Sequence, residues 1–273
     1  MLEISEISRS SYYKWKNTKD NRAKKYEEEE LIKAKIKELY NKHKGRYGVK
    51  RMTHELKRNN IHINHKKAYR IMKENGYLSV VKRKKRYKKS AEENPKQNIL
   101  QRNFTTTRPY DKMATDVSEI NMFGKKIYIS PIKDLHTKMI ESVEIGEHAT
   151  LITVMKMIKK IEKNALKDGT IIQTDQGSIY QSKKYQDLLE KNNFIPSMSR
   201  KGTPIDNAPI ESFFSTLKSE TIYNPNIKIE TYKQLEKEIR KYIKYYNNER
   251  IQAGLGYLTP KEYKEQEEKR LCV

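Results

Sequence analysis

The chain has 273 residues, of which 58 are Lys or Arg and 35 are Asp or Glu, so its formal net charge is +23. It holds no apolar run near the roughly 18–20 residues of a membrane span, no N-terminal secretory signal and a single cysteine, which together exclude a membrane protein, a disulfide framework and a cysteine-based zinc site. We therefore expect a soluble intracellular protein with no membrane partner, and the excess positive charge predicts a polyanionic partner.

The first predicted helix runs from Asn21 to His43. Ile32, Ile36 and Leu39 recur in it at helical spacing, which places them on one face of the helix. Upstream of this helix stands Trp15, the only tryptophan, which we interpret as a packing anchor.

Two shorter helices are predicted at Val49–Lys57 and Lys66–Asn75. Asn64 is a plausible N-cap of the second, because its side chain can accept from the free amides of the first turn, and Gly76 is a plausible C-terminal stop. Two helices with a short polar joint in a basic chain suggest a helix-turn-helix at about residues 46–78 of an all-helical region, 1–78. An ordinary αα-hairpin has the same pattern, so the alternative stays open.

Residues 79–107 show no sustained period and are predicted to form a basic linker. Seven of the eight residues from Lys82 to Lys89 are Lys or Arg. Such a block repels itself, stays extended and is a common form of nucleic-acid-binding arm. The candidate DNA contacts in it are Lys82, Arg83, Lys84, Lys85 and Arg86.

Beyond the linker the pattern becomes that of an α/β domain with a mixed sheet, followed by helices. This is the element order of the ribonuclease-H-like fold, which we expect over residues 108–225, with a C-terminal helical extension over 226–273. The predicted strands are 113–120, 126–132, 139–145, 170–174 and 194–198, and the predicted helices are 150–161, 183–192, 210–220 and 232–247.

Three acidic residues of this domain stand where the fold would bring them together. Asp116 lies on the first strand, Asp175 ends the fourth, and Glu211 opens a helix that crosses the sheet edge. Carboxylates are the ligands that Mg²⁺ prefers, and two such ions can assist phosphoryl transfer. With 35 acidic residues, however, such spacing also arises by chance, and each residue has an ordinary structural explanation.

Five segments carry a more specific signal: ISRSSYYKW at 7–15, YGVKRM at 47–52, TPIDNAPIESFF at 203–214, YYNNER at 245–250 and LGYLTP at 255–260. In this order they resemble the second-reading-frame (OrfB-type) protein of the IS-three group of insertion-sequence transposases, which has a retroviral-integrase-like core. The likeness covers nearly the whole chain. Departures such as Gln173-Thr174 before the second Asp remove no metal ligand.

The resemblance implies a DNA transposase that nicks at an element end and joins the freed 3′-hydroxyl to another phosphodiester. Asp116, Asp175 and Glu211 would be the catalytic residues and would hold the metal, two Mg²⁺ ions for which Mn²⁺ substitutes. It also implies a basic residue seven positions after Glu211, here Lys218, within reach of a phosphate because seven residues return to nearly the same helix face. A solvated helix lysine is the alternative for Lys218.

The expected partners are double-stranded DNA, at the element ends and at the target, further copies of the chain on that DNA, and the upstream-frame protein. The expected location is the bacterial cytoplasm, on the nucleoid. Base edges would be contacted from the recognition helix, and further contacts would come from a loop before Glu211. The candidates are Lys66, Lys67, Arg70, Arg200 and Lys201.

Two other functions fit part of the sequence. One is a DNA-binding remnant or regulator that occupies element ends without catalysis. The other is a ribonuclease-H-like nuclease acting on RNA–DNA hybrids, which leaves the helix-turn-helix and the segment TPIDNAPIESFF unexplained.

Overall fold

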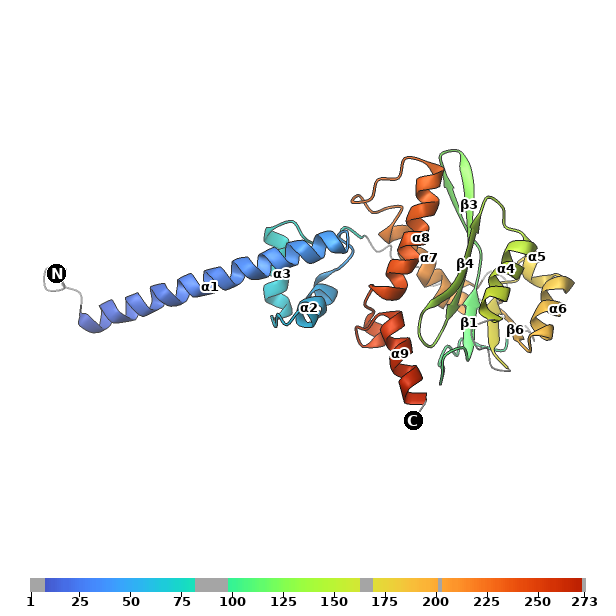
Figure 1. Cartoon of the computed structure of the whole chain (residues 1–273), viewed down its shortest axis with the longest axis horizontal. Helices are drawn as coiled ribbons and strands as arrows, with labels where there is room; N and C mark the ends of the chain where they lie inside the picture. Colours follow the sequence, from blue (N-terminus) through green and yellow to red (C-terminus); the bar gives the residue numbers. More distant parts are fainter. Residues whose placement is uncertain (1–7, 82–97, 163–168, 201–202, 272–273) are drawn as a thin grey trace. The chain divides into compact units, whose positions relative to one another are not determined.

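The computed structural model describes residues 8–81, 98–162, 169–200 and 203–271. The chain divides into two compact units, residues 1–80 and 81–273 (Figure 1). Within the described residues, no helix combines the length and the apolar character needed to cross a bilayer.

The first unit consists of α1 (Arg9–Lys42), α2 (Val49–Arg58) and α3 (His65–Glu74). The predicted N-cap is confirmed, since Asn64 Oδ1 accepts from the Lys66 backbone amide at 2.9 Å. The predicted stop is confirmed as well, because Gly76 follows α3 with φ = 71°, a left-handed conformation that glycine adopts at little cost.

The core of the first unit joins the C-terminal part of α1 to both shorter helices. Ile36, Leu39, Met52, Leu56 and Ile71 are all buried. The helix begins twelve residues earlier than expected, at Arg9 instead of Asn21. Our interpretation of Trp15 as a packing anchor was wrong, because its side chain lies on this added length and is 59% exposed.

The described residues of the second unit form a six-stranded mixed sheet. One edge of β3 pairs antiparallel with β4, and the other edge pairs antiparallel with β2 and β1 in succession. Parallel pairs then continue the sheet from β1 to β5 and β6. The strands are β1 (Lys112–Thr115), β2 (Ser118–Met122), β3 (Lys125–Asp134), β4 (Ile140–Gly146), β5 (Ile171–Thr174) and β6 (Ile195–Met198).

The single strand expected at 113–120 is interrupted in the structure. Thr115 pairs with Ile132 and Ser118 with Ile129, so β1 and β2 share one continuous register on β3. In that register Asp116 lies opposite Pro131, which has no N–H to donate to the ladder. The interruption therefore releases Asp116 from regular pairing.

Helices cover both faces of the sheet (Figure 1). On one side lie α4 (Leu151–Glu162), α5 (Ser178–Gln181) and α6 (Lys183–Lys191); on the other lie α7 (Ala208–Glu220), α8 (Tyr232–Asn248) and α9 (Pro260–Leu271). Helices α5 and α9 were not predicted. Two short 3₁₀ turns, Pro204–Asn207 and Ala253–Leu255, precede α7 and α9.

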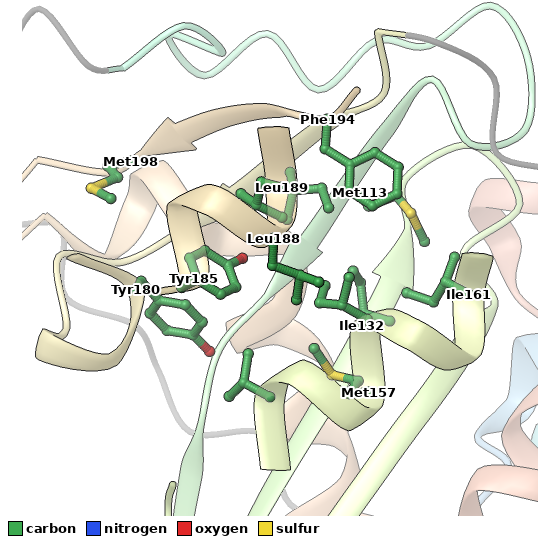
Figure 2. Packing of buried hydrophobic residues seen from close by; sticks show 13 residues of the cluster. Met113, Ile132, Met157, Ile161, Tyr180, Tyr185, Leu188, Leu189, Phe194 and Met198 are labelled. Atoms are coloured by element: carbon green, nitrogen blue, oxygen red, sulfur yellow. The ribbon is translucent and has the colours of Figure 1, made fainter. Parts of the chain in front are cut away.

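The face covered by α4 and α6 has a continuous apolar core (Figure 2). Sheet residues such as Met113 and Ile172 pack there against Met157 of α4 and Leu189 of α6. Full burial of one such side chain stabilises the fold by about 1.5–3 kcal/mol. On the opposite face, the Phe213 ring of α7 meets Tyr246 of α8 edge to face, with centroids 5.1 Å apart.

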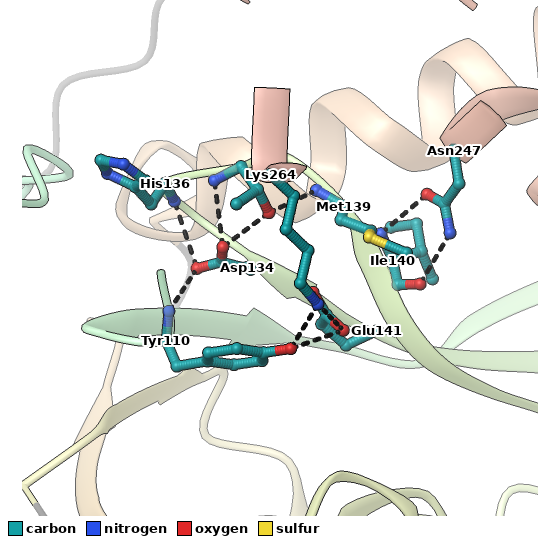
Figure 3. A network of polar contacts seen from close by, with 9 residues as sticks. Tyr110, Asp134, His136, Met139, Ile140, Glu141, Asn247 and Lys264 are labelled. Atoms are coloured by element: carbon teal, nitrogen blue, oxygen red, sulfur yellow. Dashed lines mark hydrogen bonds and ion pairs between the residues drawn. The ribbon is translucent and has the colours of Figure 1, made fainter. Parts of the chain in front are cut away.

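Side chains of α8 and α9 attach these helices to β4 (Figure 3). The Asn247 amide donates to the Ile140 carbonyl at 2.9 Å and accepts from the Ile140 amide at 3.0 Å, so it satisfies backbone groups of an edge strand. Lys264 of α9 donates to Glu141, at 3.2 Å to Oε1, and to the Tyr110 hydroxyl. The C-terminal helices are thereby held to the sheet that carries the candidate site.

Candidate active site

Asp116 and Asp175 lie at the same edge of the sheet. Strands β1 and β5 run parallel, with Ala114 paired to Gln173. Two residues further along this register, the two strands reach Asp116 and Asp175, each half-buried. This confirms the prediction that the first strand neighbours the one ending at Asp175.

Each of the two carboxylates is oriented by a backbone amide just after it. Asp116 Oδ1 accepts from the Val117 amide at 2.7 Å, and Asp175 Oδ1 accepts from the Gly177 amide at 2.9 Å. A Cβ at Gly177 would lie 2.9 Å from Asp175 Oδ1, closer than side chains tolerate. Gly177 is therefore a positioning residue that our sequence analysis missed, although a glycine two residues after the carboxylate was its visible signal.

Glu211 enters from α7, whose start is fastened to the sheet beside Asp116. The Asn207 amide reaches the Thr115 carbonyl at 3.4 Å, and the Lys133 ammonium donates to the Pro209 carbonyl at 3.2 Å. Glu211 follows in the first turn of the helix. Lys133 was missed because nothing in the pattern of β3 distinguishes a buried lysine from an exposed one.

Electrostatics couple the three carboxyl groups. Burial, together with the neighbouring charges of Asp175 and Glu211 and against the hydrogen bond from the Val117 amide, raises the pKa of Asp116 to about 7. Tyr180 is buried in the apolar core (Figure 2), and its phenol pKa is raised by burial and also by Tyr185, Asp116 and Asp175. Asp116 thus lies close to the negative charges of Asp175 and Glu211 in a partly desolvated environment.

A cation with oxygen ligands suits this donor set, because carboxylates are hard ligands and their mutual repulsion is relieved by positive charge. Within the described residues, no three His, Cys, Asp or Glu side chains are already gathered closely enough to hold a metal ion. Asp116, Asp175 and Glu211 therefore fit a divalent cation by their ligand chemistry and charge. In this structure the three carboxyl groups stand too far apart to bind one ion together.

Lys218 lies on α7, seven residues after Glu211. Its half-buried ammonium donates to the Glu119 carbonyl of β2 at 3.2 Å, and burial lowers its pKa. The contact fixes the side chain between α7 and β2. Its expected contact with a phosphate stays a prediction.

Arg200 takes part in a buried cluster around Asp206, just before α7. The Arg200 guanidinium donates to both Asp206 oxygens at 2.7 and 2.8 Å, Arg102 donates at 2.8 Å, and the Asn98 amide at 3.1 Å. Asp206 itself is fully buried, and the Arg200 hydrogen bonds hold its pKa far below the usual range. Arg200 could contact DNA only through the part of its side chain that stays exposed to solvent. Lys201 lies outside the described residues.

The candidate recognition residues all lie on α3. Lys66 is exposed, whereas Arg70 donates to Glu29 of α1 at 2.6 Å and to Glu74 at 3.1 Å. Lys67 stands 3.9 Å from the same Glu29 carboxylate. To contact a base, Arg70 must give up its ion pairs with Glu29 and Glu74. The expected contacts of the α3 residues with DNA therefore also stay predictions. The candidates from Lys82 to Arg86 fall outside the described residues.

Comparison with known proteins assigns both units. Residues 25–85 match an HTH-like domain, and residues 106–204 and 211–267 each match an integrase core domain. The chain is 36% identical to the putative transposase InsK for insertion sequence element IS150 of Escherichia coli K12, over 97% of this chain and 93% of that protein. It belongs to the insertion-sequence transposases.

Further relatives of the transposase agree with this assignment. It is 40% identical to an uncharacterized transposase-like protein of Haemophilus influenzae, over 79% of this chain and 99% of that one. It is 25% identical to the transposase InsF for insertion sequence IS3A of E. coli K12, over 96% and 92%. The resemblance to an OrfB-type protein with an integrase core is confirmed.

The fold expectation is confirmed too: the transposase has a helix-turn-helix-like N-terminal region and a ribonuclease-H-like core with a mixed sheet. Among solved structures, the HTLV-2 integrase catalytic core domain is similar at 16% identity, with a TM-score of 0.42, over 56% of this chain and 94% of that one.

Proposed function

We propose that this transposase cleaves DNA strands at the ends of its insertion sequence and transfers the freed 3′-hydroxyls to target DNA, using Asp116, Asp175 and Glu211. The observation that carries the proposal is the electrostatic coupling of these carboxyl groups, which come from two strand ends and one helix, in a chain of the transposase family. Carboxylates that meet at the ends of neighbouring strands can hold divalent cations, which neutralise the negative charge that develops on phosphate oxygens.

The three carboxylates would hold Mg²⁺, for which Mn²⁺ substitutes, as two ions. When bound, such ions activate the attacking oxygen and stabilise the leaving one in an in-line displacement. The protein's own part is to orient the carboxylates: the Val117 amide fixes Asp116, and the Gly177 amide fixes Asp175. Since the three groups are not yet gathered closely, we expect them to draw together when cations bind.

The partner in this proposal is duplex DNA, first at the element ends and then at the target. Lys218 would contact a phosphate near the cleaved end by exchanging its bond to the Glu119 carbonyl. The recognition helix and the basic linker would bind phosphates and base edges elsewhere on the duplex. Several copies of the chain, with or without the upstream-frame protein, would assemble on the DNA of the nucleoid.

The decisive experiment is nicking and strand transfer on a duplex that carries the terminal inverted repeat flanking the gene, with Mg²⁺ or Mn²⁺. Asp175→Asn and Glu211→Gln should abolish both steps and leave DNA affinity within a few-fold of wild type. Asp187→Asn, an acid removed from the exposed side of α6, is the matched control and should retain activity. Cleavage by Asp175→Asn would refute the assignment of the site.

The same assay decides against catalysis if the wild type binds the element end and never cleaves it, also when the upstream segment is fused on. The chain would then be a regulator or remnant that occupies element ends. Cleavage only in the fused form would place the chemistry in this chain and its activation upstream.

A further inference from the structure

The N-terminal part of α1 is a basic helix without an intramolecular partner in the described part of its unit. Residues 9–26 carry seven Lys or Arg against one Asp. From Arg9 to Glu28, every residue whose exposure the structure describes is exposed, and Ile36 is the first of the described side chains of the helix to be buried. Figure 1 shows this part of α1 continuing beyond α2 and α3. A helix that packs on nothing is only marginally stable in water, which points to a missing partner.

Aromatic side chains share this surface with the charges. Tyr12, Trp15, Lys19, Arg22 and Tyr26 follow one another at spacings of three and four residues, so they form one stripe along the helix. Tyr26 is 69% exposed and Trp15 nearly as much. The Lys19 ammonium lies 5.4 Å from the centre of the Trp15 ring, and the Tyr12 ring lies 6.3 Å from it. Large aromatic rings exposed to water next to cations suggest an interaction surface.

The chemistry of the stripe identifies the partner as a polyanion. A second helix would require apolar residues at these positions, and it would bury Lys19 and Arg22 at its centre without an acidic counterpart on this stripe. Duplex DNA offers about one negative charge per 1.7 Å of its axis, to which the basic groups are complementary. The stripe from Tyr12 to Tyr26 spans about 21 Å, the length of about six base pairs.

We propose that residues 9–26 of α1 form a second duplex-DNA contact surface, centred on Trp15, Lys19 and Arg22. Residues 9–24 lie outside the part of the chain that matches the HTH-like domain. The surface goes beyond the catalytic proposal, because it needs neither the metal nor the three carboxylates.

The first test uses Trp15 itself, since it is the only tryptophan of the chain. The full-length protein is titrated with a 40-base-pair duplex of arbitrary sequence in EDTA and low salt, while anisotropy of the labelled duplex reports binding. We expect the emission of Trp15 to change and its acrylamide quenching constant to fall at least twofold in the complex. Unchanged emission and quenching in a saturated complex would overturn the proposal.

The second test compares two charge-matched double variants. Lys19→Gln/Arg22→Gln removes the cations of the stripe, whereas Lys24→Gln/Lys25→Gln removes two that the helical period turns away from Trp15. At about 0.9 per phosphate contact, the first pair should reduce the slope of log K against log salt by about 2, and the control pair by less than about 0.5. Equal reductions would mean diffuse attraction and would overturn the proposal. Circular dichroism at 222 nm checks that both variants keep the helix.

A third measurement separates DNA from a protein partner. Without DNA, protection of Trp15 from acrylamide that increases with protein concentration would mean that a second copy covers the stripe, which would overturn the proposal. Asp175→Asn should give the same Trp15 response to DNA as wild type. That outcome separates failure of this surface from failure of the catalytic site.

Discussion

The buried ion pair between Arg250 and Glu220 allows a quantitative prediction about stability. Arg250 Nε and Nη2 donate to the two Glu220 oxygens at 2.8 and 2.7 Å, and the Tyr242 hydroxyl donates to Glu220 at 3.0 Å. The side chains are only 7% and 3% exposed. Removing one partner of such a pair leaves a buried charge and typically costs about 3–5 kcal/mol. We therefore expect Arg250→Met to lose that amount of unfolding free energy.

Helix α8 itself offers the matched control. Arg240 pairs with Glu236 at 2.8 Å, but these side chains are 48% and 37% exposed. Exposed pairs four residues apart contribute about 0.3–0.5 kcal/mol, so Arg240→Met should cost no more than that from the ion pair. With nearly equal distances, the two variants test whether burial decides the effect.

Urea unfolding followed by far-ultraviolet circular dichroism measures the difference. With a slope of about 2 kcal/mol per molar urea, Arg250→Met should lower the midpoint by about 1.5–2.5 M, and Arg240→Met by less than about 0.3 M. Replacing both partners, in Glu220→Gln/Arg250→Met, should recover part of the loss because no buried charge remains. Similar midpoints for Arg250→Met and Arg240→Met would refute the reasoning.

Three further predictions concern groups around the candidate site. Gly177→Ala should reduce strand cleavage at least tenfold while DNA binding stays unchanged, because its Cβ would displace the Asp175 carboxylate; wild-type cleavage would contradict this. Asp206→Asn should destabilise the protein most at neutral pH: the folded pKa of Asp206 is depressed, so its contribution is complete above the unfolded value of about 3.9 and is lost as pH falls through the folded pKa, and urea midpoints should converge toward pH 2. Lys133→Met should lower the rate of strand cleavage while the melting temperature changes little, because the bond to the Pro209 carbonyl sets where α7 begins. A loss of cleavage that goes with a matching loss of folded protein at the assay temperature would reduce Lys133 to a scaffold role.

The sequence predicted the elements that have a strong local signal. Helix α3 begins after Asn64 and ends before Gly76 as expected, because caps act through neighbouring backbone groups. The neighbouring positions of Asp116 and Asp175 were also predictable, since parallel strands adjacent in a fold end at the same edge. The break between β1 and β2 was not, because it depends on Pro131, which lies on the partner strand.

Interactions between distant residues escaped the analysis for the same physical reason. Asn247 binds a backbone 107 residues away, and Arg102 reaches Asp206 across 104 residues. Side-chain periodicity carries no information about such pairs. The exposed position of Trp15 was missed too, since an aromatic residue on a helix gives the same pattern whether the helix is packed or free.

The motifs that identify the family hold one helix in place at both of its ends. At the start of α7, Asp206 of the segment TPIDNAPIESFF binds Arg200, and Asn207 reaches the strand that leads to Asp116. At its end, Arg250 of the segment YYNNER binds Glu220. Because Glu211 stands between these attachments, a change at either end moves the carboxylate relative to the sheet. The proposed chemistry therefore requires these residues, which contact neither metal nor DNA, as well as the three acidic residues.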